Sequence, residues 1–130
     1  ERQKDICSIP LCRIHGDYHP WNTIHKEDKI YVIDWTYRFG DFRYDVMWTY
    51  ALLYRSGYDS FATKFLNRYE RDIKILDREF FLVLANLRWY VNVKDSLKKH
   101  FDKQLYHVIK IQMTRLNEMM PFSYSLDLDY

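Results

Sequence analysis

The sequence predicts a mainly helical α+β domain in which a short β-hairpin precedes about four helices. Short apolar runs alternate with polar turns in the first third of the chain, and apolar residues recur at helical spacing in the rest. The 130 residues are 48% hydrophobic and 18% aromatic, with only 3 Gly and 3 Pro. This composition excludes a disordered chain or a fibrous repeat, and the length suffices for one hydrophobic core.

A β-hairpin is predicted where two short apolar runs flank the polar stretch KEDK. The runs cover residues 23–25 and 30–33, so the connection is expected to have four residues. Every position of the run IYVI is apolar, and we therefore expect this strand to be buried on both faces. Asp34 follows directly, at a strand end, where a carboxylate is typical of a functional site.

Two helices are predicted after the hairpin region. Apolar residues at helical spacing cover residues 46–53, and Gly57 follows as a stop signal. A second stripe covers residues 61–69, and Asp59 or Ser60 stands where an N-cap is expected.

Two longer helices are predicted in the second half of the chain. Asp77 can cap the first of them, and the last ends before Pro121. The stripes expected to face the core consist of Phe80, Phe81, Leu84, Leu87, Val91, Val93, Phe101, Leu105, Val108, Ile109, Gln112, Met113 and Leu116.

The charge pattern and the cysteines indicate an ordinary cytoplasmic protein. Twenty Lys and Arg against 18 Asp and Glu leave a net charge of +2, which does not favour nucleic acid as a partner. No apolar run approaches the roughly 18 residues of a membrane span, and no signal peptide is present. Cys7 and Cys12 have no second pair that would complete a zinc site, and we expect reduced thiols. The basic cluster within residues 98–110 is expected to be solvated surface, with a phosphate-rich partner as the alternative.

The residues with the strongest chemical signal lie in LCRIHGDYHPWNTI, at positions 11–24. Asp17 and Asn22 flank Pro20 in a loop directly before the hairpin. Asn22 and Asp34 would supply hard oxygen ligands, which suit Mg²⁺ completed by water and nucleotide phosphates. Asp17 would then accept a proton from an attacking hydroxyl, which completes the minimum apparatus for phosphoryl transfer.

Three linked segments resemble one family. HGDYHPWN resembles the H-G-D-x-x-x-x-N catalytic loop of the aminoglycoside and choline kinase-like phosphotransferases, and IDW at residues 33–35 resembles their metal-binding strand end. GDFRYDVMW at residues 40–48 is similar to the G-D-P-x-x-D-L-A segment that follows in this family. The Asp17 to Asn22 separation also matches the protein kinase loop, whereas His15–Gly16 in place of His–Arg indicates the small-molecule branch.

The resemblance implies a role for each matched residue. Asp17 would be the catalytic base, and Asn22 and Asp34 would be the Mg²⁺ ligands. His15 would brace the loop, and Asp45 would tie it to the following helix, where we also expect Asp45 as the N-cap. The implied reaction transfers a phosphoryl group from ATP or GTP to a hydroxyl of an aminoglycoside-, choline- or homoserine-like molecule, and the residues that bind this acceptor are not identified.

The sequence departs from the family pattern at some positions, and several residues near the motifs are not expected to take part in the chemistry. Phe42 replaces the usual Pro, and residues 46–47 are Val–Met where the family has Leu–Ala; both changes affect packing alone. His19 and His25 are expected to be exposed rather than metal ligands. The tryptophans are expected in the core rather than in a substrate platform, and they are Trp21, Trp35, Trp48 and Trp89.

The nucleotide-binding half of such an enzyme is missing from the sequence. Nothing before residue 11 can hold a five-stranded lobe, and the three glycines, Gly16, Gly40 and Gly57, form no phosphate-covering loop. Residues 1–130 are therefore expected to be a protein kinase-like C-terminal lobe, truncated at Glu1 and inactive alone. We expect self-association through the surface that the missing lobe leaves exposed.

Two other classes of function remain open from the sequence. The main alternative is a noncatalytic binding or scaffold protein of kinase-like descent, such as a spore-coat-like protein or a pseudokinase. The intact Asp17, Asn22 and Asp34 argue against it, whereas the missing nucleotide lobe argues for it. A metal-dependent hydrolase using the same oxygen ligands ranks last, because the sequence shows no second metal cluster.

Overall fold

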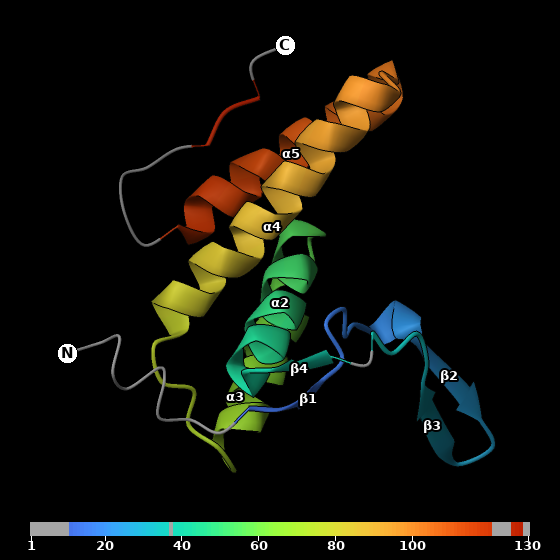
Figure 1. The fold of residues 1–130 in the computed structure, drawn as a ribbon, viewed down its shortest axis with the longest axis vertical. Coiled ribbons are helices and arrows are strands. Elements are labelled where there is room, and N and C mark those ends of the chain that lie inside the picture. Colours follow the sequence, from blue (N-terminus) through green and yellow to red (C-terminus); the bar gives the residue numbers. More distant parts are fainter. Residues whose placement is uncertain (1–10, 37, 121–125, 129–130) are drawn as a thin grey trace.

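The described part of the chain forms four α-helices, one 3-10 helix and two small antiparallel sheets. A computed structural model of the protein describes residues 11–36, 38–120 and 126–128. In chain order the elements are β1 (Cys12–Ile14), the 3-10 helix η1 (Pro20–Asn22), β2 (Thr23–Lys26), β3 (Lys29–Val32), β4 (Arg38–Gly40), α2 (Phe42–Arg55), α3 (Asp59–Glu70), α4 (Arg78–Lys99) and α5 (Lys103–Met119). This mainly helical architecture agrees with the predicted α+β class (Figure 1).

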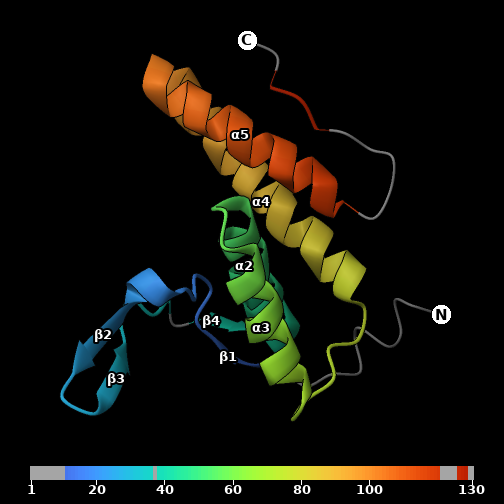
Figure 2. The same ribbon diagram turned by 180° about the vertical axis from the view of Figure 1, so that it is seen from behind.

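The β2–β3 hairpin is present, but two details of its prediction are wrong. Lys26 pairs with Lys29, so the connection has two residues instead of four. Ile30 and Tyr31 in β3 are 63% and 47% exposed, although we expected this strand to be buried on both faces. The reason is visible in Figures 1 and 2, where the hairpin projects away from the helices and gains no cover from them.

The second sheet anchors residues 12–14 to the helices. β1 runs antiparallel to β4, with Cys12 opposite Gly40, and β1 also contacts α2. Cys12 is a free thiol, as expected, and Cys7 lies outside the described residues. The polypeptide between β1 and β4 is therefore held at both ends, and it contains both the projecting hairpin and the loop before it.

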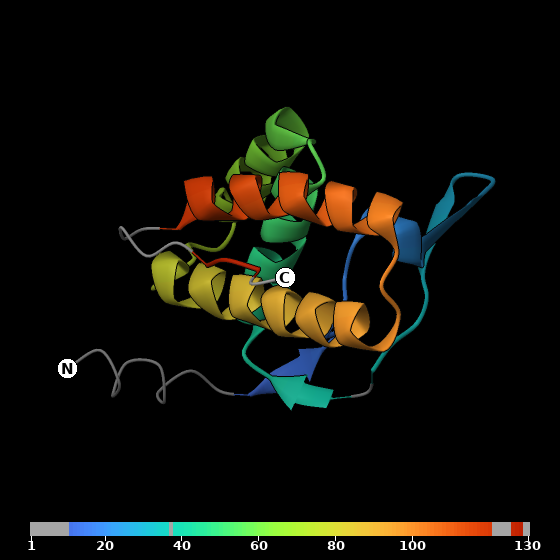
Figure 3. The same cartoon turned by 90° about the horizontal axis from the view of Figure 1, so that it is seen from above.

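Helix α2 is the centre of the helical part. It contacts α3, α4 and α5, and α4 and α5 run side by side in opposite directions (Figure 3). Val46 and Met47 of α2 pack with Leu66 of α3 and Phe81 of α4 in one buried cluster. A second cluster lies between α4 and α5, and it contains Leu97, Ile109, Met113, Leu116 and Leu128.

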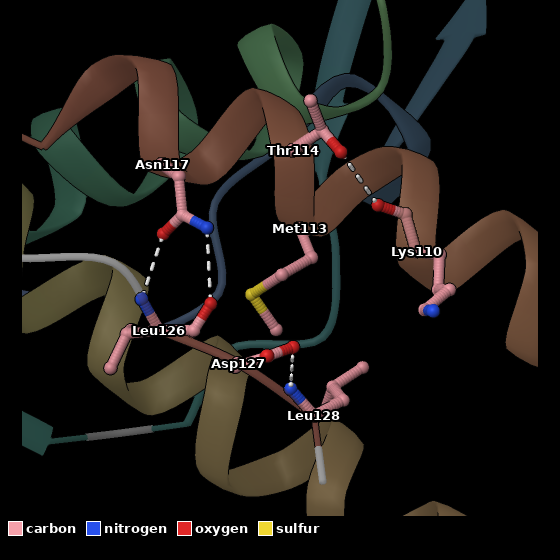
Figure 4. A pocket seen from close by; sticks show the side chains of 7 residues that line it. All are labelled: Lys110, Met113, Thr114, Asn117, Leu126, Asp127 and Leu128. Atoms are coloured by element: carbon pink, nitrogen blue, oxygen red, sulfur yellow. Dashed lines mark hydrogen bonds between the residues drawn. The ribbon is translucent and has the colours of Figure 1, made fainter. Parts of the chain in front are cut away.

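The C-terminal segment 126–128 completes this second cluster. The Asn117 side chain donates to the Leu126 carbonyl and accepts from the Leu126 N–H, each at 3.0 Å, as Figure 4 shows. Tyr90 of α4 donates to the Asp127 carbonyl at 2.8 Å, and the Leu128 side chain is 5% exposed. The segment lines a cavity of about 390 Å³ with α5, and no residue of the loop before β2 lines that cavity.

Helix capping differs from the prediction in three places. Asp41, and not Asp45, caps α2 by accepting from the Arg43 N–H at 3.0 Å, and Asp45 lies in the first turn. Tyr58 occupies the N-cap position of α3 and makes no side-chain cap bond. Asp77 does occupy the N-cap position of α4, but its φ of 54° is left-handed and its carboxylate caps nothing.

The apolar stripes predicted for α4 and α5 are only partly buried. Of the predicted residues, Phe81, Ile109, Met113 and Leu116 are in the core, and Leu97, which was not predicted, is buried as well. The following predicted core residues are exposed instead: Phe80, Leu84, Leu87, Val91, Phe101, Leu105 and Val108. Each helix is apolar on more than one side, and the described neighbours cover one side only. No described helix combines the length and the hydrophobicity that a membrane crossing requires.

Arg55 is a buried cation between α2 and α4. Arg55 is 2% exposed, donates to the Asn86 carboxamide oxygen at 2.6 Å, and lies over the rings of Trp48 and Trp89. Burial lowers the pKa of Arg55 to about 9, which still leaves the guanidinium charged at neutral pH. The side chain thus joins the two helices beneath the loop that carries the candidate site.

Candidate active site

A carboxylate on α2 anchors the loop that leads from β1 to η1. Asp45 accepts the His15 N–H at 2.6 Å through Oδ2 and the Gly16 N–H at 2.8 Å through Oδ1. Charged acceptors form the stronger class of hydrogen bond, and the first turn of a helix favours a negative charge. The structure therefore places Asp45 between the loop and the helix, with both carboxylate oxygens engaged by the loop backbone.

His15 connects the same loop to the end of β3. Its ring is 3% exposed, its Nδ1 lies 3.2 Å from the Asp17 backbone nitrogen, and its Nε2 lies 2.8 Å from the Ile33 carbonyl oxygen. A backbone N–H can only donate, so Nδ1 is the acceptor, and we assign the ring proton to Nε2, which donates to Ile33. The neutral imidazole thus bridges the backbones that carry Asp17 and Asp34.

Only glycine fits at position 16. Its φ is +83°, and a Cβ built there would lie 2.5 Å from Thr36 Oγ1. That hydroxyl cannot easily move away, because it donates to the His15 carbonyl at 2.6 Å. Arg88, from α4, donates to the Gly16 carbonyl, so the loop is also held from a third element.

The Asp17 side chain is one-third exposed and has a fixed orientation. Its Oδ1 accepts from the indole Nε1 of Trp48 at 2.7 Å, and its side chain is 34% exposed. Its Oδ2 lies 3.6 Å from Nε2 of His19, whose side chain is 14% exposed. The expectation that His19 is an exposed loop residue is therefore wrong: its ring lies against Asp17, and its Nδ1 has no hydrogen-bond partner in the part of the chain that the structure describes.

Asn22 and Asp34 meet at one end of the β2–β3 hairpin. The Ile33 N–H donates to the Asn22 carbonyl at 2.9 Å, which extends the ladder beyond the Thr23–Val32 pair. Asp34 follows directly, and it has a φ of 63°, a left-handed backbone that few non-glycine residues adopt. Such strained residues gather at functional sites. The backbone pairing thus places Asn22 and Asp34 near each other at this end of the hairpin.

The Asn22 carboxamide is oriented by the same loop. Its Nδ2 donates to the Asp17 carbonyl at 3.0 Å, closing the loop across five residues. Because the amide nitrogen is engaged there, the amide oxygen is the end of the side chain left for a cation. Asn22 is half-buried and Asp34 is exposed.

This donor set fits Mg²⁺ better than a transition metal. The described residues contain no group of three or more His, Cys, Asp and Glu that could hold a metal ion by themselves. A carboxylate and a carboxamide are too few for a structural zinc site, but Mg²⁺ takes one or two carboxylates and completes its shell with water and substrate phosphates. Asn22 and Asp34 fit that pattern.

Two contacts of the site were missed in the sequence. Trp48 was assigned to the core, and it is 5% exposed, but its indole N–H contacts Asp17. Trp48 follows Asp45 by three positions, so both lie on one helix face. This spacing could have indicated that Trp48 also faces the loop. Arg88 contacts the loop from 72 residues away, and nothing in the local sequence marks it. Trp21 and Trp35, also expected in the core, are 56% and 40% exposed.

A comparison with family models finds a match that covers the site. The model of the phosphotransferase enzyme family, APH, matches residues 2–81, which is more than half of the chain. The matched range contains Asp17, Asn22, Asp34 and Asp45, and it ends near the start of α4. Comparisons with curated proteins and with solved structures found no match.

Proposed function

The chain belongs to the phosphotransferase enzyme family, and from this membership we propose that residues 1–130 form the C-terminal, protein kinase-like lobe of an ATP- or GTP-dependent kinase. The acceptor is a hydroxyl of a small molecule of the aminoglycoside, choline or homoserine kind. The nucleotide-binding lobe of this enzyme lies outside the chain, so residues 1–130 alone are inactive.

The observation that carries this proposal is the arrangement of Asp17 and Asn22 on one anchored loop. The Asp17 carboxylate is partly exposed, held through one oxygen by Trp48, and linked through its own carbonyl to Asn22. A general base must lie within reach of the proton that it accepts, and its geometry must be fixed before the reaction. The partial exposure of Asp17 and its fixed orientation support its assignment as this base.

In the proposed reaction, Asp17 accepts the proton of the acceptor hydroxyl. The hydroxyl oxygen forms a bond to the γ-phosphorus while the bond from that phosphorus to the nucleoside diphosphate breaks. Asn22 and Asp34 would hold Mg²⁺, which would supply neutralisation of phosphate charge when bound. His15 and Asp45 keep the backbone of the loop in place, since Asp45 accepts two of its N–H groups and His15 links it to Ile33.

The test uses the complete protein that contains this chain, assayed against a panel of small hydroxyl compounds. Asp17→Asn removes the base and should lower kcat by about 10²- to 10⁴-fold. Asp28→Asn is the matched control, because Asp28 lies exposed in the hairpin turn, and it should keep wild-type turnover. Retained turnover in Asp17→Asn would show that the proposed mechanism is wrong.

Nucleotide binding is tested separately by thermal unfolding. A ligand that binds only the folded state raises its stability by mass action, so Mg²⁺ together with ATP or GTP should raise the melting temperature of the complete protein. Asn22→Ala and Asp34→Ala should reduce the Mg²⁺-dependent part of that shift. Absence of both the shift and turnover would favour the noncatalytic binding protein.

A further inference from the structure

The contact between α2 and the candidate base is directional. Trp48 Nε1 donates to Asp17 Oδ1 at 2.7 Å, and an indole nitrogen can donate but not accept. The Trp48 ring is 5% exposed, so its orientation is set by the packing of α2 and α4 around it. A buried donor of this kind selects one orientation of the carboxylate and leaves Oδ2 as the oxygen that faces a substrate.

Arg88 of α4 supports both partners of this contact. Its guanidinium carbon lies 4.2 Å from the centroid of the Trp48 ring, a distance at which a cation is attracted to an aromatic face. The same guanidinium donates to the Gly16 carbonyl and, at 2.8 Å, to the Tyr44 hydroxyl. Arg88 therefore fixes the position of the Trp48 indole relative to the backbone next to Asp17.

We propose that Trp48 and Arg88 are positioning residues for the reaction: Trp48 orients the Asp17 carboxylate through Oδ1, and Arg88 holds Trp48 and the loop together. This inference rests on the proposed function, in which Asp17 is the base. It adds that Oδ2, whose neighbour His19 lies at 3.6 Å, receives the proton of the acceptor hydroxyl. A residue that served core packing alone would have no effect specific to Asp17.

The contact itself is tested by NMR on the ¹⁵N-labelled chain of 130 residues. The indole N–H signal of Trp48 is assigned by its loss in Trp48→Phe, and that of Trp89 by its loss in Trp89→Phe. Asp17→Ala removes the acceptor, so the Trp48 signal should shift and its N–H should exchange faster with solvent, while the Trp89 signal stays in place. A Trp48 signal that does not respond to Asp17→Ala would overturn the proposal.

The kinetic role is tested in the complete protein. Trp48→Phe keeps the ring under Arg88 but removes the N–H, and kcat should fall about tenfold, since one oriented hydrogen bond to a charged group is lost. KM for the nucleotide and for the acceptor should stay unchanged. Trp89→Phe is the matched control, because Trp89 packs against Arg55 and should leave kcat unchanged. Unchanged kcat in Trp48→Phe, with kcat lost in Asp17→Asn, would overturn the positioning role alone.

Two further outcomes are decisive. If Asp17→Asn keeps wild-type kcat, the proposed function fails, and the positioning role fails with it. If Trp48→Phe unfolds the protein, Arg88→Lys perturbs the same contact without changing the indole, because lysine keeps the charge but lacks the planar fork of donors. Arg88→Lys should lower kcat several-fold at unchanged KM, and wild-type kcat in that variant would overturn the role of Arg88.

Discussion

Replacing Asp45 by alanine should be among the most destabilising single changes in this chain. The Asp45 carboxylate accepts the backbone N–H groups of His15 and Gly16 at 2.6 and 2.8 Å, in a part-buried setting. Alanine leaves both donors without an acceptor, and the loop cannot turn them to solvent without moving. Asparagine keeps one acceptor oxygen but directs an NH₂ group toward the other N–H.

The expected magnitude follows from these two donors. An unsatisfied buried donor costs about 1–3 kcal/mol, and the charge at the first turn of α2 adds roughly 0.3–1 kcal/mol. We therefore expect Asp45→Ala to lower the free energy of unfolding by about 3–5 kcal/mol, and Asp45→Asn by about half as much. Domains are stable by about 5–15 kcal/mol, so this loss would bring a domain at the lower end of that range close to unfolding at room temperature.

Urea unfolding followed by far-UV circular dichroism measures this loss. Asp72→Ala is the matched control: the Asp72 carboxylate is 71% exposed and pairs with Arg68 one helical turn away, a contact worth about 0.3–0.5 kcal/mol. If Asp45→Ala lost no more stability than Asp72→Ala, the claim that Asp45 anchors the loop would be refuted.

Two other predictions concern glycine and tyrosine. Gly16→Ala should lose about 2 kcal/mol more than Gly57→Ala, because both residues have left-handed backbones (φ +83° and +87°) but only the new Cβ at position 16 meets Thr36; equal losses in urea unfolding would contradict the steric argument. Burial raises the pKa of Tyr50 and of Tyr69 above 10.0, so above about pH 10 the unfolded chain loses these protons first and stability should fall as the pH rises. The double variant Tyr50→Phe, Tyr69→Phe should lose less stability than wild type between about pH 9 and pH 11, and an equal loss would show that other groups cause the alkaline fall.

The order of the hairpin and the helices could be predicted because their signals are local, whereas the β1–β4 sheet joins segments about 25 residues apart and was not predicted. Apolar spacing within ten or twenty residues indicated the hairpin and each of the four helices. Which face of a helix is buried could not be predicted in this way, since it depends on which neighbours pack against the helix. In α4, Phe81 is buried and its neighbour Phe80 is 50% exposed, although both are equally apolar and were both expected in the core.

The candidate site, like the fold, could be predicted only in part. Asp17, Asn22 and Asp34 could be proposed from spacing and chemistry, because they lie within eighteen residues of one another and match a short pattern. The environment of Asp17 could not be predicted. Trp48 reaches it from 31 residues away, and Arg88 holds the adjacent carbonyl from 72 residues away.

The sequence alone therefore determined the class of fold, the order of the hairpin and the helices, the family, and the residue types available for phosphoryl transfer. The tertiary structure decided which helix faces are buried, that the hairpin projects, that Asp41 and not Asp45 caps α2, and that an indole from α2 holds the candidate base. The physical reason is the sequence separation of the residues involved. Periodicity and motif spacing depend on residues that are close in the chain. Burial and hydrogen-bond partners depend on distant segments that only folding brings together.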